Sequence, residues 1–214
     1  MPAEFLSDEQ RAAYGSFMEM PTQSELEKFF FLDAFDRDVI ARSRADSHRL
    51  GVALQIGTVR FKGLFLEDPL SVPWPVVDYL AEQLGIGDPS QVKRYTVRAQ
   101  TAYKHKWMIR DAYGYRVFAD RDSWEGRQLA KGFLAFLHGR AWTHAKGPTA
   151  LFDQSVAWLR RHRVLLPGVT VLEQLGGSVR KRPVGKVGST SRHVRCPCRW
   201  AEVGLCKASW WSAN

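Results

Sequence analysis

The chain has 214 residues, of which 45% are hydrophobic and 12% aromatic, so it can bury a core and is not disordered throughout. No apolar run approaches the ~20 residues that a membrane span requires. The N-terminus is acidic and lacks a basic region before an apolar stretch, which indicates no signal peptide. All three cysteines lie beyond residue 195, which leaves no disulfide framework for the body of the chain. We therefore expect a soluble, cytoplasmic protein without membrane contact.

The net charge of +9 is unevenly placed along the chain. Residues 1–90 hold 8 Lys and Arg against 15 Asp and Glu, a balance of −7, whereas residues 91–214 hold 23 against 7, a balance of +16. Such asymmetry indicates a basic half that meets a polyanion, because each neutralised phosphate of a nucleic acid releases condensed counterions. The competing interpretation is an ordinary solvated basic face.

Helix-start signals open the chain. Ser7 with Gln10, and Thr22 with Glu25, have the spacing of capping boxes, in which two side chains satisfy free backbone donors. Asp36 is the expected cap of the next helix. Residues 47–61 are apolar nearly all round at helical spacing, which predicts a helix central to a core. His48 lies on the narrow polar seam of that helix and is interpreted as a residue of the core edge rather than a ligand.

Prolines and glycines mark the helices that follow. Pro73 and Pro75 precede a helix that ends at Gly85, and Asp88 with Pro89 starts another helix at once. Helices are also expected over residues 95–113, 123–138, 148–162 and 167–175. No stretch alternates as a strand does; residues 169–172 come closest, and the Pro-Gly before them fits a helix start equally well.

These patterns predict an all-α, multi-helix module with helix-turn-helix-like elements and a disordered basic C-terminal tail. We divide the chain into residues 1–120, an N-terminal helical subdomain with the helix-turn-helix-like segment; residues 121–175, a second helical subdomain; and residues 176–214, an aberrant tail.

The segment 76–98 has features of a helix-turn-helix. Ala81 is a small residue where two helices would touch, Gly85 would make the turn, and Val92 would anchor the second helix on the first. The turn is one residue longer than the usual pattern. The outer side of the second helix would carry residue types that contact phosphates and base edges: Ser90, Gln91, Lys93, Arg94 and Arg98.

The adjoining segment extends this basic surface. Arg94, Arg98, Thr101 and His105 would line one face of a continuous helix, with Lys104 and Trp107 on the neighbouring face. The competing interpretation is an amphipathic helix with a solvated cationic side. A second basic group, Arg160, Arg161 and Arg163, lies at a helix C-terminus, where it would complement the helix dipole with or without DNA.

The sequence offers no catalytic motif. Asp33, Asp36 and Asp38 lie close together, but Arg37 interrupts them and helix capping accounts for them more simply. No nucleophile elbow, phosphate loop or HExxH motif is present. His193, Cys196, Cys198 and Cys206 have a spacing that is tight for one tetrahedral zinc site. We therefore expect no catalytic residue, no metal and no cofactor.

Several separated blocks carry a resemblance. In order they are FLSDEQRAAYGSF, HRLGVALQIGTVRFKG, VPWPVVDYLAEQLGI, RYTVRAQTAYKHKWMIRDAYGYRVF and LLPGVTVLEQL. Together they resemble the N-terminal region of replicative transposases of the Tn-three type, a domain of unknown function, from about Phe5 to Leu175. The resemblance implies helical domains that bind terminal inverted repeats in double-stranded DNA, with the acidic metal-binding triad in a much later domain. It places the family's basic block on Lys93, Arg94, Arg98, Lys104 and His105.

The resemblance stops after Leu175. Residues 176–214 hold 8 Lys and Arg, one acid, all three cysteines and three tryptophans, which is the composition expected of a shifted reading frame. We expect a truncated transposase fragment that binds transposon ends and is not an enzyme, because the catalytic triad domain is missing. The alternatives are an interaction or inhibitory fragment that acts on intact transposase, or on further copies of itself, and a stand-alone helix-turn-helix regulator.

Overall fold

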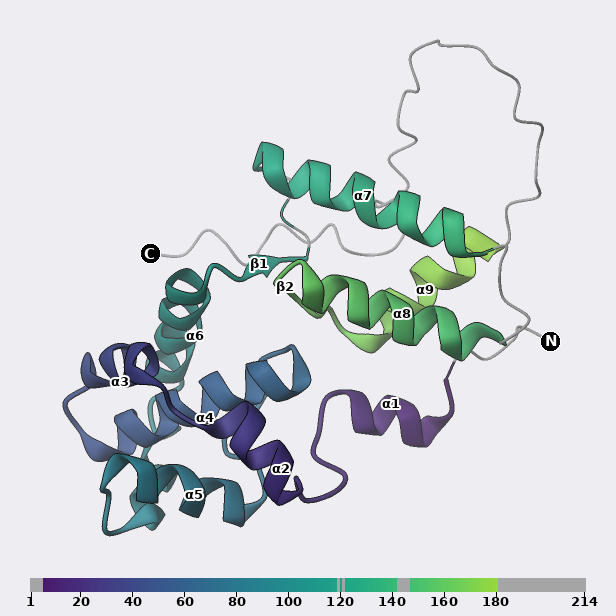
Figure 1. Cartoon of the computed structure of the whole chain (residues 1–214). Coiled ribbons are helices and arrows are strands. Elements are labelled where there is room, and N and C mark those ends of the chain that lie inside the picture. The colour runs from purple at the N-terminus through teal and green to yellow at the C-terminus, as the bar shows by residue number, and fades with distance from the viewer. Residues whose placement is uncertain (1–5, 119, 121, 142–146, 181–214) are drawn as a thin grey trace, which may run out of the picture.

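The computed structural model describes residues 6–118, 120, 122–141 and 147–180, and nearly all regular secondary structure in this part is helical, as expected for an all-α protein (Figure 1). The first elements are α1 (Asp8–Tyr14), α2 (Gln23–Glu25), the π-helix η1 (Leu26–Phe30), α3 (Ala34–Ala41), α4 (Asp46–Lys62) and α5 (Trp74–Leu84). The 3₁₀-helix η2 (Pro89–Arg94) and α6 (Ala99–Tyr113) follow. Then come β1 (Arg116–Val117), α7 (Trp124–Ala141), α8 (Gly147–Arg161), β2 (Val164–Leu165) and α9 (Val169–Arg180). None of the described helices is long and apolar enough to cross a membrane.

Helix α4 is the centre of the first core, as its sequence predicts. Every residue from Leu50 to Val59 is buried, because η1, α3, α5, η2 and α6 all contact this helix. Gly51 lets the ring of Tyr95 lie directly on the helix backbone, where a Cβ atom would be 2.3 Å from the ring.

The helix starts confirm two predicted caps and correct a third. Ser7 and Thr22 each form the expected capping box. The cap of α3 is Asp33, however, and Asp36 is the third residue of that helix. Asp36 accepts a hydrogen bond from the Asp33 backbone N–H, and its fully buried carboxylate also accepts hydrogen bonds from Arg60 and Tyr113.

The turn between α5 and η2 has the predicted small residues. Ala81 is buried, and Gly85 ends α5 in the left-handed conformation at φ 65°, donating to the carbonyl oxygens of Ala81 and Glu82. Val92 is buried against the first core, as an anchor should be. The second helix differs from the prediction: it is a 3₁₀-helix of six residues rather than an α-helix.

The prediction of a continuous helix over residues 95–113 is wrong for the first turn of that helix. Helix α6 starts at Ala99, with Arg98 as its extended N-terminal cap, and residues 95–98 turn between η2 and α6. The cause is Tyr95, whose side chain is fully buried against α4. Arg94 and Arg98 therefore do not share one helical face with Thr101 and His105.

The second core lies among α7, α8 and α9 and includes Leu6, which precedes α1. The Tyr14 hydroxyl donates to the carbonyl oxygen of Pro167 at 2.8 Å, and Arg11 pairs with Glu173 at 3.0 Å. The first helix of the chain thus packs on its last described helices. Helix α9 ends at Arg180, five residues beyond the expected tail boundary at Leu175, and residues 181–214 lie outside the described residues.

Two short strands were not predicted. Arg116 and Val117 pair in parallel with Val164 and Leu165. The same region ties the two cores together, because the backbone N–H of Leu166 donates to the carbonyl oxygen of Gly63 at the end of α4. Residues 169–172, the nearest to a strand by sequence, lie in α9.

Candidate nucleic-acid interface

A pocket of about 300 Å³ lies where the first turns of α4 and α6 meet the segment after η2. We call it the α4–α6 pocket, and its lining residues are Ser47, His48, Arg94, Tyr95, Val97, Arg98 and Thr101. Arg94 and Arg98 are exposed, and none of the seven lining residues is acidic. Three of the four residues predicted for one helical face, Arg94, Arg98 and Thr101, thus line a common concave surface, although a turn separates the two arginines from most of the helix.

The local structure of η2 directs Arg94 outwards. Asp88 caps η2 by accepting a hydrogen bond from the Ser90 backbone N–H at 3.0 Å. Val92 and Tyr95, three residues apart, then bury their side chains on the same side. Lys93 and Arg94, which lie between them, remain exposed.

The other predicted residues of η2 have different surroundings. The Ser90 hydroxyl donates to the Asp88 carboxylate at 2.6 Å, and these hydrogen bonds lower the pKa of Asp88. Gln91 is half-buried. The Lys93 ammonium lies 5.8 Å from the ring centre of Trp74. Ser90 and Lys93 therefore already have partners within the chain.

His105 is half-buried against Tyr95 and is not one of the lining residues of the α4–α6 pocket. Its ring stacks on Tyr95, and its Nδ1 is 3.0 Å from the Tyr95 hydroxyl, which also accepts a hydrogen bond from buried Gln55 at 2.7 Å. Burial lowers the pKa of His105, and nearby His48 lowers it further. His105 is therefore placed to support Tyr95.

Lys104 and Trp107 lie further along α6. Lys104 is exposed. Trp107 is half-buried, with the Arg110 guanidinium 4.0 Å from its ring centre and Tyr103 against its edge. Neither residue lines the α4–α6 pocket.

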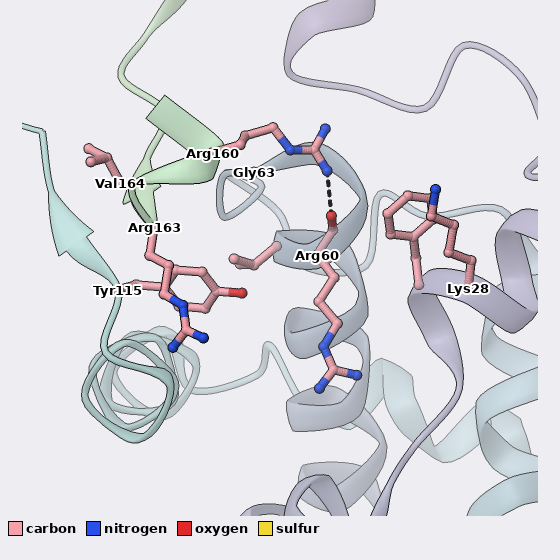
Figure 2. A pocket seen from close by; sticks show the side chains of 9 residues that line it. Lys28, Arg60, Gly63, Tyr115, Arg160, Arg163 and Val164 are labelled. Atoms are coloured by element: carbon pink, nitrogen blue, oxygen red, sulfur yellow. Dashed lines mark hydrogen bonds between the residues drawn. The ribbon is translucent and has the colours of Figure 1, made fainter. Parts of the chain in front are cut away.

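A second pocket, of about 330 Å³, lies between the two cores (Figure 2). We call it the junction pocket. Its polar lining residues are Lys28, Arg60, Tyr115, Arg160 and Arg163, and its remaining lining residues are Phe29, Val59, Gly63 and Val164. Four of the nine residues are cationic and none is acidic. Arg161, the third member of the predicted group, is exposed but does not line this pocket.

Backbone contacts hold the two predicted arginines of the junction pocket. Arg160 donates to the carbonyl oxygen of Arg60 at 2.6 Å, as the dashed line in Figure 2 shows. Arg163 donates to the carbonyl oxygen of Tyr113 at 3.3 Å. Arg163 also has a φ of 53°, a left-handed conformation that costs an L side chain roughly 1–2 kcal/mol relative to glycine.

Several pocket residues lie outside the basic segments that the sequence singles out. Ser47 and His48 fall in the predicted core helix, and Lys28, Arg60 and Tyr115 belong to no local pattern that indicates a site. Their positions depend on contacts between distant segments, so the basic residue types were the only available signal.

No cluster of His, Cys, Asp or Glu that could hold a metal ion occurs among the residues that the structure describes. The sequence-predicted zinc candidates, from His193 to Cys206, lie outside those residues. Asp33 and Asp36 form the cap of α3, and Asp36 also pairs with Arg60, whereas Asp38 is exposed on the same helix.

The chain is thus a basic, all-helical module with two hydrophobic cores. The α4–α6 pocket lies on the first core, and the junction pocket lies between the two cores. The chain belongs to the family described as "Domain of unknown function (DUF4158)", whose model matches residues 5–179. The matched range contains both cores and both pockets, and it ends one residue before the end of α9.

The relatives of this chain are transposases. The transposase for transposon gamma-delta of Escherichia coli (strain K12) is 37% identical over 182 residues, 85% of this chain. The transposase for transposon Tn1546 of Enterococcus faecium is 28% identical over 188 residues, 87% of this chain. The chain spans only 18% of the length of either relative and corresponds to their N-terminal region.

Proposed function

We propose that this chain is a DNA-binding module that recognises the terminal inverted repeats of a transposable element. The observation that carries the proposal is the α4–α6 pocket, in which Arg94 and Arg98 lie exposed beside Thr101 without an acidic lining residue. Arginine makes bidentate contacts to phosphates and to guanine edges, so this surface fits DNA. The class of DNA is suggested by the transposase relatives together with the resemblance, which implies helical domains that bind terminal inverted repeats.

In this proposal the residues have different roles. Arg94 and Arg98 contact the duplex directly, and Thr101, Lys104 and Gln91 contribute at the margin. His105 acts through Tyr95, whose hydroxyl lies 3.0 Å from the His105 Nδ1. The chain corresponds to only 18% of the relative's length, and the resemblance implies that the acidic triad lies in a much later domain, so we propose no catalytic role for this chain.

The test is a binding titration with the full chain. One duplex carries the terminal repeat of the element that encodes the chain, and the other has a random sequence of equal length. We expect tighter binding to the repeat, and a 10- to 100-fold loss, roughly, when Arg94 and Arg98 are both changed to Ala. Lys131→Ala, which removes an exposed charge on α7, is the matched control.

Three results would contradict parts of the proposal. Equal affinity of the wild type for both duplexes would mean that the surface is a basic patch without preference for the repeat. Unchanged affinity of the Arg94→Ala, Arg98→Ala double variant would show that these two arginines do not contact the DNA. Association with an intact transposase in the absence of DNA, combined with no DNA binding, would favour the interaction fragment instead.

A further inference from the structure

We infer that the junction pocket is a second phosphate-binding site, which takes a backbone phosphate of the same duplex. This inference rests on the proposed function and adds a contact that the helix-turn-helix-like segment does not include. Its ligand is a phosphate group, and the source that the charge of the whole chain favours is DNA.

The first argument is the origin of the charges. Lys28 comes from η1, Arg160 from the end of α8, and Arg163 from the turn before β2 (Figure 2). Lys28 is more than 130 positions from the two arginines in the sequence, yet all three side chains line one concavity. Like charges brought together by folding repel one another, so an anion between them relieves a repulsion that the free protein retains.

The second argument is that these cations have no ion-pair partner in the part of the chain that the structure describes, although the Lys28 ammonium lies 5.0 Å from the ring centre of Phe29. Among the described residues, no ion pair joins Lys28, Arg160 or Arg163 to a carboxylate. Arg160 and Arg163 each use one guanidinium nitrogen on a backbone oxygen and keep further donors. Arg60 is different, because its guanidinium is held by Asp36.

The third argument concerns Arg163 and Tyr115. Arg163 is the only described residue other than glycine with a positive φ, and glycine or asparagine would adopt this conformation at lower cost. Arg163 lines the pocket together with Tyr115, and its guanidinium lies beside the Tyr115 ring in Figure 2. The Tyr115 hydroxyl supplies a neutral donor, because burial raises its pKa.

The proposed site has a consequence for the two cores. Lys28 lies in η1, which packs on α4 in the first core. Arg160 and Arg163 lie at the end of α8 and directly before β2, next to the second core. A phosphate held by both sides would therefore link them, in addition to the hydrogen bond from Leu166 to Gly63.

The experiment compares the salt dependence of DNA binding for the full-length wild type, Lys28→Gln, Arg163→Gly and the control Lys131→Gln. Loss of one phosphate contact lowers the slope of log affinity against log salt by about 0.9 and the affinity by about tenfold at 0.1 M salt. We expect both changes for Lys28→Gln and Arg163→Gly on repeat and random duplexes alike, so that the preference for the repeat is retained. Arg163→Gly should fold at least as stably as the wild type, since it relieves the left-handed conformation.

The outcomes separate the two proposals. Wild-type slope and affinity in both pocket variants would overturn the junction site while leaving the proposed function intact. A wild type without preference for the repeat would overturn the proposed function. Thermal unfolding in sodium phosphate and in sodium chloride of equal ionic strength distinguishes the source: a phosphate-specific rise in Tm, lost in the variants that retain normal DNA binding, would assign the pocket to free phosphate and overturn the DNA contact.

Discussion

Gly51 and Tyr95 show how single residues shape the proposed DNA surface. The Tyr95 ring lies against the backbone of α4 because residue 51 has no side chain, and this contact turns the chain before α6 begins. Buried Gln55 and half-buried His105 then hold the Tyr95 hydroxyl. Arg94 and Arg98 flank this anchored residue, so their positions depend on it.

We expect Gly51→Ala to destabilise the protein by roughly 1–3 kcal/mol, because its new methyl group would overlap the Tyr95 ring. Urea unfolding measures the change. Gly139→Ala is the matched control, since Gly139 is exposed in α7 with no atom within 4 Å of its added Cβ, and alanine should favour that helix. Equal stability of the two variants would contradict the contact.

The second prediction at this scale concerns pH. The folded state lowers the pKa of His105, so the unfolded chain binds a proton more readily than the folded chain does. This group's contribution to stability is therefore complete above its unfolded pKa of about 6.5 and is lost as the pH falls through the lower, folded value. The urea midpoint should fall on acidification below pH 6.5. His105→Gln should flatten that dependence, whereas His138→Gln, at an exposed site on α7, should not.

At the scale of elements, Asp36 connects three helices. Its carboxylate in α3 binds Arg60 of α4 and Tyr113 of α6, and it completes the cap of its own helix. The Arg60 side chain is 24% exposed, so the ion pair is partly screened, but the Asp36 side chain is not exposed at all.

Asp36→Asn should cost about 3 kcal/mol of unfolding free energy, because it leaves Arg60 without its counter-charge in a mostly buried place. Calorimetry or urea unfolding gives this value. Asp38→Asn, on the exposed side of the same helix, should change stability by no more than about 0.5 kcal/mol. A loss of similar size in both variants would mean that only the acidic character of α3 matters.

The same elements mark how far sequence reasoning reaches. Caps at Ser7 and Thr22, the turn at Gly85 and the buried helix α4 follow from local patterns, so they were predictable. Asp36 was assigned to capping because its partners Arg60 and Tyr113 lie 24 and 77 residues away. The break at residues 95–98 and the pairing of β1 with β2 also depend on distant contacts. For the candidate site, the sequence predicts its basic residue types but not which of them share a pocket.

At the scale of the whole molecule, the two hydrophobic cores divide the chain differently from the predicted boundary at residue 120. The first core contains residues from Leu26 to Ile109, while the second combines Leu6 with residues from Phe133 to Val179. We propose that these cores, rather than a division near residue 120 alone, are the two cooperative units. The N-terminal segment then belongs to the second unit.

Hydrogen exchange tests this division. Leu6→Ala removes a buried side chain of the second core and should destabilise that unit by roughly 2–5 kcal/mol. Amide exchange should accelerate in α8 and α9 and remain slow in α4. Leu54→Ala, at an equally buried site of the first core, should give the reverse pattern. Uniform acceleration in either variant would identify a single cooperative unit.

The hydrogen bond from Tyr14 to Pro167 joins residues 153 positions apart, which has a consequence for synthesis on the ribosome. Translation at 5–20 residues per second leaves α1 without its partners for about 8–30 s after it has been made. During that interval the segment from Leu26 to Ile109 emerges and can assemble first. Helix α1 is therefore among the last described elements to reach its final place, although it is made before the segments that it contacts.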